Sequence, residues 1–356
     1  MLPYYILCVI PCFPFLLRVR IRIRHGIKTT REQSSITLFF LVLFLLLALR
    51  ASSVGRDLTN YQYMFRRFSK IPFDQTFSIH TETGYVLLNK LVALFGGDFQ
   101  CFLAVLAVIS VIPIAIVYRK EVEISYLTIA LFLSSSNFIF LFSGLRQSIA
   151  IATGMISYIF VKEKRPLYFI LTVLAAFLFH RSAIALLLLY PVYHMSLTRK
   201  KLLFIIPILV LLFIFNKQIF SALLFIFSDI YSGATSATGA YLTLFLYILF
   251  AVFSYVVPDE KKLDDNTVGL RNILLLCIVL QMFAMWHSLA MRVNYYFIIF
   301  IPLLIPKIIN RASSRCKGIA VAAKYIMVFF FMLYFFINAP KSNSLDTFPY
   351  HFFWEL

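Results

Sequence analysis

Long hydrophobic segments recur along almost the whole of this chain and leave little room for a soluble fold. Most of them approach or exceed the roughly 17 to 25 residues that an α-helix needs to cross a bilayer. Hydrophobic residues make up 62% of the 356 residues and charged residues only 13%, whereas soluble domains use roughly 45 to 50% apolar residues. The sequence therefore predicts an all-α, polytopic integral membrane protein.

About twelve hydrophobic segments can be delimited by their apolar runs. They are residues 3–17, 36–50, 99–118, 124–142, 144–161, 166–179, 182–195, 201–216, 240–257, 271–289, 292–309 and 321–338. The polar stretches between them are too short to fold as a separate soluble domain. We therefore expect one transmembrane helical bundle over residues 1–356.

The orientation follows from Lys and Arg, which are enriched in cytoplasmic loops. If residues 18–34 are cytoplasmic, strict alternation also places the basic loop 306–324 inside. Most of the formal net charge of +18 then belongs to inside loops. This arrangement predicts both termini on the non-cytoplasmic side. We attribute the basicity to orientation and to contact with anionic membrane lipids, and predict no nucleic-acid partner.

Residues 166–195 admit two interpretations. One long tilted helix would reverse every later loop and place residues 306–324 outside. Two short helices keep that basic loop inside, so the charge pattern favours two. A tight external turn at His180 and Arg181 follows from this choice.

The long polar loop 51–98 is predicted to lie outside. One helical face of its first part is apolar and carries Leu58, Tyr61, Phe65 and Phe68. This pattern predicts either an amphipathic helix in the outer interface or a short connecting helix packed on the bundle. The apolar run that follows Glu82 is too short to span, so we expect a re-entrant or interfacial helix there.

Arg146 is flanked by apolar sequence on both sides, and so is Arg292. An ionised guanidinium at membrane depth costs roughly 2.5 to 3.5 kcal/mol on insertion scales. Such a residue tends to be kept for an ion-pair partner or for an anionic ligand. Arg146 is therefore the first candidate for a functional residue.

Strict alternation brings ionisable residues from five separate places in the sequence to the same outer boundary. They are Arg56, Asp57, Glu82, Arg146, His180, Arg181 and Arg292. The alternative interpretation is that individual members only cap a helix or extend along it toward water. The pattern nevertheless predicts a charged cluster at the outer face.

Several motifs occur in a characteristic order. They are Asp57 with Tyr61, Glu82-Thr83-Gly84-Tyr85 with Leu88-Asn89, Gly144-Leu145-Arg146-Gln147, Phe179-His180-Arg181-Ser182-Ala183 and Arg292-Val293-Asn294-Tyr295-Tyr296-Phe297. Together they resemble the EpsG family of polysaccharide-synthesis membrane proteins, which is similar to Wzy-type O-antigen, capsule and exopolysaccharide polymerases. The resemblance runs from about residue 36 to the Pro349-Tyr350 tail. One departure is Arg56, where family members often carry Gly or Thr.

The resemblance implies a membrane glycosyltransferase of the bacterial cytoplasmic (inner) membrane. Such an enzyme joins oligosaccharide repeat units carried on polyprenyl (undecaprenyl) pyrophosphate at the outer face of that membrane. The implied partners are the lipid-linked oligosaccharide, membrane lipids, and a chain-length regulator and flippase of the same pathway. No cofactor is implied, and the scattered histidines of the sequence predict no metal site.

The implied chemistry assigns roles to the predicted cluster. Arginines bind a pyrophosphate leaving group well because they are permanently charged and bidentate. We expect Arg146 and Arg292 to clamp the pyrophosphate with help from Arg181. Glu82 is the predicted general base, with Asp57 or His180 as alternatives. An ion pair of Arg146 with Asp57 or Glu82 is the structural alternative. The remaining predicted substrate contacts are Arg56, Tyr85, Gln147 and Tyr295.

Two other functions remain open at this point. One is another polyprenyl-sugar-dependent membrane glycosyltransferase, which the acidic residues of loop 51–98 would suit. The other is a flippase or transporter of lipid-linked glycan. A transporter is expected to show inverted repeats and ionisable residues near the midplane of the bilayer. No repeat is evident, and the candidate residues gather at one face.

Overall fold

The computed structural model describes residues 2–9, 30–197, 199–226, 240–286, 288–343 and 345–355. Within these ranges the chain is helical, and its only β-pairings are two isolated bridges. The predicted all-α class is therefore confirmed. The helices form two compact units, Met1–Ile184 with Lys324–Leu356, and Ala185–Ala323.

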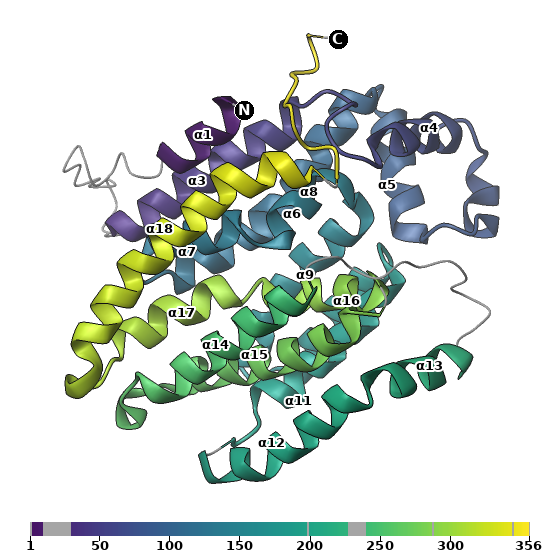
Figure 1. Cartoon of the computed structure of the whole chain (residues 1–356). Coiled ribbons are helices and arrows are strands. Elements are labelled where there is room, and N and C mark those ends of the chain that lie inside the picture. Colours follow the sequence, from purple (N-terminus) through teal and green to yellow (C-terminus); the bar gives the residue numbers. More distant parts are fainter. Residues whose placement is uncertain are drawn as a thin grey trace. The chain divides into compact units, whose positions relative to one another are not determined.

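The first unit is built on long helices that pack side by side. Its α-helices are α1 (Leu2–Val9), α3 (Arg31–Leu49), α4 (Leu58–Phe68), α5 (Thr83–Leu94), α6 (Phe99–Glu121), α7 (Ser125–Leu133), α8 (Ser136–Ser143), α9 (Leu145–Lys162) and α10 (Pro166–Phe177). Helix α6 packs against both α3 and α9, and α9 packs in turn against α10. Figure 1 shows α4 and α5 projecting together at one edge of this unit.

The ends of these helices follow from local sequence. Thr30 and Gln33 form a capping box at the start of α3, in which each side chain bonds to the backbone of the other residue. Asp98 caps α6 by accepting from the backbone N–H of Cys101. Between α7 and α8, Ser134 and Ser135 interrupt the helical ladder, and the two helices bend by 58°.

Helices α4 and α5 form the core of loop 51–98, together with the 3-10 helix η2 (Phe73–Ser78). The face of α4 predicted to be apolar is buried, and it packs on α5 and α6 through Leu58, Tyr61, Phe65 and Phe68. Protein covers this face, as expected of a connecting helix packed on the bundle. The position of α4 relative to the membrane stays a prediction. The twelve residues of α5 extend only about 18 Å, which is too short to cross a bilayer.

The C-terminal tail is tied to the end of α3 and to the residues that follow it. Arg50 and Phe352 form a β-bridge, and the backbone N–H of Gly55 donates to the carbonyl of Asp346 at 2.8 Å. The tail also completes an aromatic cluster in which Tyr350 packs against Tyr4. Segments from the two ends of the sequence therefore fold together.

The second unit is arranged around α15 (Asp265–Ala284). Its other elements are α11 (Leu189–Tyr193), α12 (Arg199–Ile214), α13 (Asn216–Ile226), α14 (Ala240–Val256), η5 (Glu260–Lys262), α16 (Ser288–Ile298), α17 (Ile301–Asn310) and η6 (Ser314–Cys316). All six of these α-helices contact α15. Two elements, η3 (Arg181–Leu188) and α18 (Lys317–Ser342), cross the boundary between the units in sequence.

Fewer helices meet the length and hydropathy expected of a membrane span than the twelve segments suggest. Among the described residues four helices do so: Arg31–Leu49, Phe99–Glu121, Asp265–Ala284 and Ser314–Asn338. The number rises to seven if each of three bent helix pairs counts as one span. The difference arises because several apolar runs fold as short or broken helices. Residues 166–195, for example, divide into α10, a turn, η3 and α11. The chain is therefore broken where the two-helix interpretation places a turn, while the number of membrane crossings stays a prediction.

Some predictions lie outside the described part of the chain. Residues 10–29 include the end of the first hydrophobic segment and most of the first basic loop. The predicted positions of the termini relative to the membrane therefore stay predictions.

Candidate functional site

Three polar side chains from distant segments meet in the first unit. Glu82 immediately precedes α5, Arg146 lies in the first turn of α9, and His180 lies in the turn that follows α10. The carboxylate of Glu82 forms an ion pair with the Arg146 guanidinium through one oxygen. Its other oxygen lies 3.1 Å from Nδ1 of His180. A single carboxylate therefore connects a fixed cation and an imidazole.

The cluster is partly accessible to a ligand. The exposed fractions of the side chains are 10% for Glu82, 27% for Arg146 and 23% for His180. Glu82 lies outside the candidate membrane spans. Burial alone would raise the pKa of its carboxyl, but the hydrogen bond with His180 and the charge of Arg146 outweigh burial and lower the pKa to about 2. Glu82 is therefore ionised at neutral pH.

Two tyrosine rings, those of Tyr85 and Tyr61, lie close to Arg146. Its guanidinium carbon lies 6.0 Å from the centre of the Tyr85 ring, at the outer limit of cation–π attraction. Tyr85 in turn contacts Tyr61 on α4, with ring centroids 5.7 Å apart. The buried Nε–H of Arg146 has no hydrogen-bond partner within the described chain. The guanidinium is thus oriented but keeps one donor unused.

A close backbone contact holds Glu82 beside His180. The backbone N–H of Gly84 donates to the carbonyl of Leu178 at 2.9 Å. A Cβ on Gly84 would lie 2.8 Å from that carbonyl oxygen, closer than real side chains approach. Glycine at this position therefore lets the start of α5 lie directly against the turn that carries His180.

Asp57 reaches the same region through a hydroxyl group. The Oγ of Ser143 donates to the Asp57 carboxylate at 3.1 Å, and the Asp57 backbone N–H lies 3.3 Å from the same Oγ. Ser143 ends α8, three residues before Arg146. Asp57 forms no ion pair within the described residues, so of the two carboxylates expected to pair with Arg146, Glu82 is the one that does so.

The sequence pattern of one known family matches this chain over residues 35–352, which is nearly its whole length. The chain belongs to the EpsG family. This is a family of Wzy-like polymerases, and membership together with the long apolar helices identifies an integral membrane protein. No curated protein and no solved structure matches the chain.

Not all of the predicted site residues of this EpsG chain join the cluster. Arg56 forms an exposed ion pair with Asp346 of the tail at 3.4 Å. Arg181 follows His180 directly and is exposed at the start of η3. Gln147 is buried in the first turn of α9. Each of these three residues directly neighbours Asp57, Arg146 or His180 in sequence, but none of them contacts Glu82.

Two further predicted residues of the EpsG chain belong to the second unit. Arg292 is exposed on α16, and Tyr295 is buried on the same helix. Their proposed contacts with substrate stay predictions. No group of three or more His, Cys, Asp or Glu side chains suited to a metal ion occurs among the described residues.

Sequence reasoning did not single out Ser143 or Gly84 as individual residues. Both belong to motifs of the EpsG resemblance or adjoin them, but their roles depend on contacts with segments 86 and 94 residues away in sequence. The available signal was a small residue within three positions of a predicted charged residue, Gly84 after Glu82 and Ser143 before Arg146. It indicates close approach without identifying the partner.

Proposed function

We propose that this EpsG protein polymerises oligosaccharide repeat units carried on polyprenyl pyrophosphate at the outer face of the bacterial cytoplasmic membrane. The observation that carries the proposal is the contact of Glu82 with both Arg146 and His180 in a partly exposed site. A transfer of this kind needs a cation for the leaving pyrophosphate and a base for the acceptor hydroxyl. The cluster contains both kinds of group.

The reaction moves one glycosyl chain and one proton. The oxygen of the acceptor hydroxyl attacks the anomeric carbon of the donor chain. The bond between that carbon and the pyrophosphate oxygen breaks, and its electron pair leaves with polyprenyl pyrophosphate. The hydroxyl proton passes to a base of the protein. The protein must therefore stabilise new negative charge on the pyrophosphate and accept one proton.

Arg146 is the proposed pyrophosphate ligand. A guanidinium binds phosphate oxygens through parallel N–H donors, and the Nε–H of Arg146 is unused within the described structure. In the structure the Glu82 carboxylate pairs with this guanidinium. An incoming pyrophosphate carries more negative charge than one carboxylate and is expected to displace it.

This displacement would also activate the base. With a pKa of about 2, Glu82 is a weak base while it is paired with Arg146. Once the pyrophosphate takes over Arg146, Glu82 loses its cation and gains an anionic neighbour. Both changes raise the pKa of a carboxyl group. Glu82 would then become a stronger base at the step that needs one, oriented by its remaining contact with His180.

Arg181 is kept as a further pyrophosphate ligand within this proposal, because it is permanently charged and exposed, as a contact with a headgroup requires. Arg292 belongs to the second unit, and its contact with substrate stays a separate prediction. Each can be tested by its own alanine variant in the assay described next.

The decisive experiment is glycan profiling of a deletion strain complemented with variants of this gene. Arg146→Ala should abolish the polymer and leave single lipid-linked repeat units on the outer face of the membrane. Arg66→Ala is the matched control, since Arg66 is an exposed arginine of α4 outside the cluster, and it should restore normal polymer. Full polymer from Arg146→Ala would remove Arg146 from the mechanism. Repeat units trapped on the inner face would indicate a transporter instead.

A further inference from the structure

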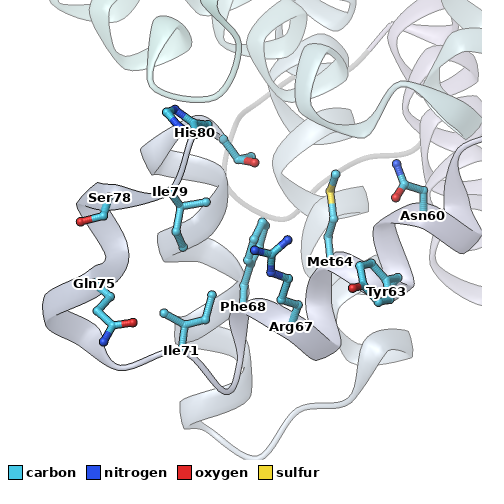
Figure 2. Close-up of a pocket in the computed structure, with 11 residues that line it drawn as sticks. Asn60, Tyr63, Met64, Arg67, Phe68, Ile71, Gln75, Ser78, Ile79 and His80 are labelled. Carbon is cyan, nitrogen blue, oxygen red and sulfur yellow. The ribbon is translucent and has the colours of Figure 1, made fainter.

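A cleft of about 730 Å³ lies beside α4 in the first unit. Figure 2 shows side chains of α4 on one side of it and side chains of residues 71–80 on the other. Its volume lies within the roughly 300 to 1,000 Å³ of typical small-molecule sites. It is formed by loop 51–98 alone, and its lining does not include Glu82, Arg146 or His180.

The lining combines groups that suit a sugar. The amides of Asn60 and Gln75 can each donate to and accept from hydroxyl groups. The exposed ring of Tyr63 offers an apolar face with a hydroxyl at its tip. Arg67 and His80 add further donors. A pyrophosphate would find only one permanent cation among the lining residues, so a polyhydroxylated ligand fits the lining better.

These polar side chains are available for a ligand. Within the described residues, no hydrogen bond or ion pair engages the side chains of Asn60, Tyr63, Arg67, Gln75 or His80. The lining also includes the apolar side chains of Met64, Phe68, Ile71 and Ile79. A lining with both polar and apolar groups matches the two chemical faces of a sugar ring, its hydroxyls and its C–H surface.

The wall opposite α4 is held in place by buried contacts. The ammonium group of Lys90, on α5, donates to the carbonyls of Ile71 and Pro72 at 2.6 and 2.9 Å. The same group lies 5.2 Å from the centre of the Phe73 ring. The hydroxyl of Thr76 donates to the carbonyl of Phe73 at 2.7 Å. The cleft is therefore preorganised, which lowers the entropic cost of binding.

The cleft adjoins the charged cluster through one covalent connection and one packing contact. Thr81 lines the cleft and directly precedes Glu82. On α4, Tyr61 turns away from the cleft, packs on Tyr85 and neighbours the Arg146 guanidinium. A ligand in the cleft would therefore lie next to the segment that carries the proposed base.

We infer that this cleft binds the glycan portion of the lipid-linked substrate, with Asn60, Arg67 and Gln75 as hydrogen-bonding residues and Tyr63 as a stacking surface. The inference rests on the proposed polymerase function. It assigns sugar recognition to loop 51–98 and pyrophosphate recognition to Arg146. The two kinds of recognition are separable, because no residue that lines the cleft belongs to the charged cluster.

The test uses the purified full-length protein in detergent and two probes. The first probe is a set of oligosaccharides prepared by partial acid hydrolysis of the surface polysaccharide of the producing strain, which carry no pyrophosphate. The second is polyprenyl pyrophosphate without sugar. Titration calorimetry should show that Arg67→Ala weakens binding of the first probe about tenfold or more and leaves binding of the second unchanged. Arg146→Ala should show the reverse pattern.

Arg66→Ala provides the matched control for the cleft. Arg66 and Arg67 are exposed neighbours on α4, but only Arg67 lines the cleft. The inference is overturned if the oligosaccharides do not bind the unaltered protein, or if Arg66→Ala and Arg67→Ala weaken binding equally. Failure of polyprenyl pyrophosphate to bind would count against the proposed role of Arg146 and would leave the glycan cleft standing.

Discussion

Arg50 and Arg146 are two arginines of the first unit that are held in different ways. Arg50 is 2% exposed. Its guanidinium lies 5.3 Å from the centre of the Phe142 ring and donates to the Leu141 carbonyl at 3.4 Å. Arg146 keeps 27% of its side chain exposed and pairs with Glu82. Both have a buried Nε–H without a partner in the described chain, so an unused donor alone does not distinguish them.

The two arginines differ in whether an anionic ligand can reach the guanidinium and replace the group that now binds it. Arg50 is held by aromatic rings and a carbonyl, which stabilise a cation but cannot leave it. Arg146 also lies near the Tyr85 ring, but its charge is paired with the partly accessible Glu82 carboxylate, for which a more highly charged anion can substitute. A charged residue in apolar sequence therefore indicates a ligand site only when its partner is exchangeable. Five experiments test this distinction, from the largest expected effect to the smallest.

Arg146→Ala should lower polymerisation by about 100-fold or more, the loss typical of removing one donor that stabilises developing negative charge. The thermal unfolding midpoint should fall by much less than for Arg50→Ala. Polymerisation is measured with lipid-linked repeat units and the purified variant. Arg146→Lys keeps the charge without the bidentate geometry, so an intermediate rate is expected.

Arg50→Ala should lower the free energy of unfolding by roughly 3 kcal/mol or more, because it leaves a large cavity beneath the aromatic cluster. The measurement is thermal or denaturant unfolding of the purified protein in detergent. Arg50→Met fills most of that volume without a charge and should cost less. If both variants unfolded like the unaltered protein but failed to polymerise, Arg50 would belong to the site.

Gly84→Ala should lower polymerisation about tenfold with a smaller loss of stability, roughly 1 to 3 kcal/mol. The added methyl group meets the carbonyl oxygen of Leu178 and forces the start of α5 away from the turn that carries His180. Gly318→Ala is the matched control, since a Cβ there has no neighbour within 4 Å, and it should behave like the unaltered protein. Equal behaviour of the two variants would count against this positioning role.

Glu82→Gln should destabilise the protein at pH 7 by an amount that disappears in acid. The folded-state pKa of Glu82 is lowered to about 2 from an ordinary value of 4.5. The stabilisation is therefore present above about pH 5 and is lost as the pH falls toward about 2. The thermal midpoints of Glu82→Gln and the unaltered protein should converge over that range. A constant difference from pH 7 to pH 3 would exclude the ion pair as its source.

Arg56→Ala should have the smallest effect. Arg56 pairs with Asp346, but their side chains are 57% and 55% exposed, and exposed ion pairs contribute roughly 0 to 1 kcal/mol. Polymerisation and thermal unfolding should both stay close to those of the unaltered protein. A large loss of polymerisation would place Arg56 among the substrate contacts, which is the role predicted for it from the sequence.

The parts of the fold that depend on local periodicity could be predicted from the sequence. The buried face of α4 consists of the four residues that helical spacing selected. The half-length α5 follows Glu82 as expected. The number of spans could not be predicted in this way, since Ser134 and Ser135 divide one apolar run into a bent pair of helices. Hydropathy does not register such a break.

The candidate site was predictable as a set of residues but not as a set of contacts. Alternation of the segments brought Glu82, Arg146 and His180 to one side, yet it did not choose between Asp57 and Glu82 as partner of Arg146. That choice depends on the contact between Gly84 and Leu178, which sets the position of α5. The cleft beside α4 was not predicted, because the position of its second wall depends on tertiary contacts, among them those of Lys90 with Ile71 and Pro72.

The aromatic enclosure of Arg50 also has a consequence for the order of synthesis. Tyr4 and Tyr350 both lie near the Arg50 charge, and the Tyr350 hydroxyl donates to the carbonyl of Leu46 at 2.8 Å. Tyr4 is synthesised before Arg50, whereas Tyr350 follows about 300 residues later. The Arg50 side chain therefore stays incompletely enclosed until Tyr350 has been synthesised. A chain that lacked Tyr350 would keep the contacts of Arg50 with Phe142 and Leu141 but would leave this charge less fully enclosed at the end of an apolar helix.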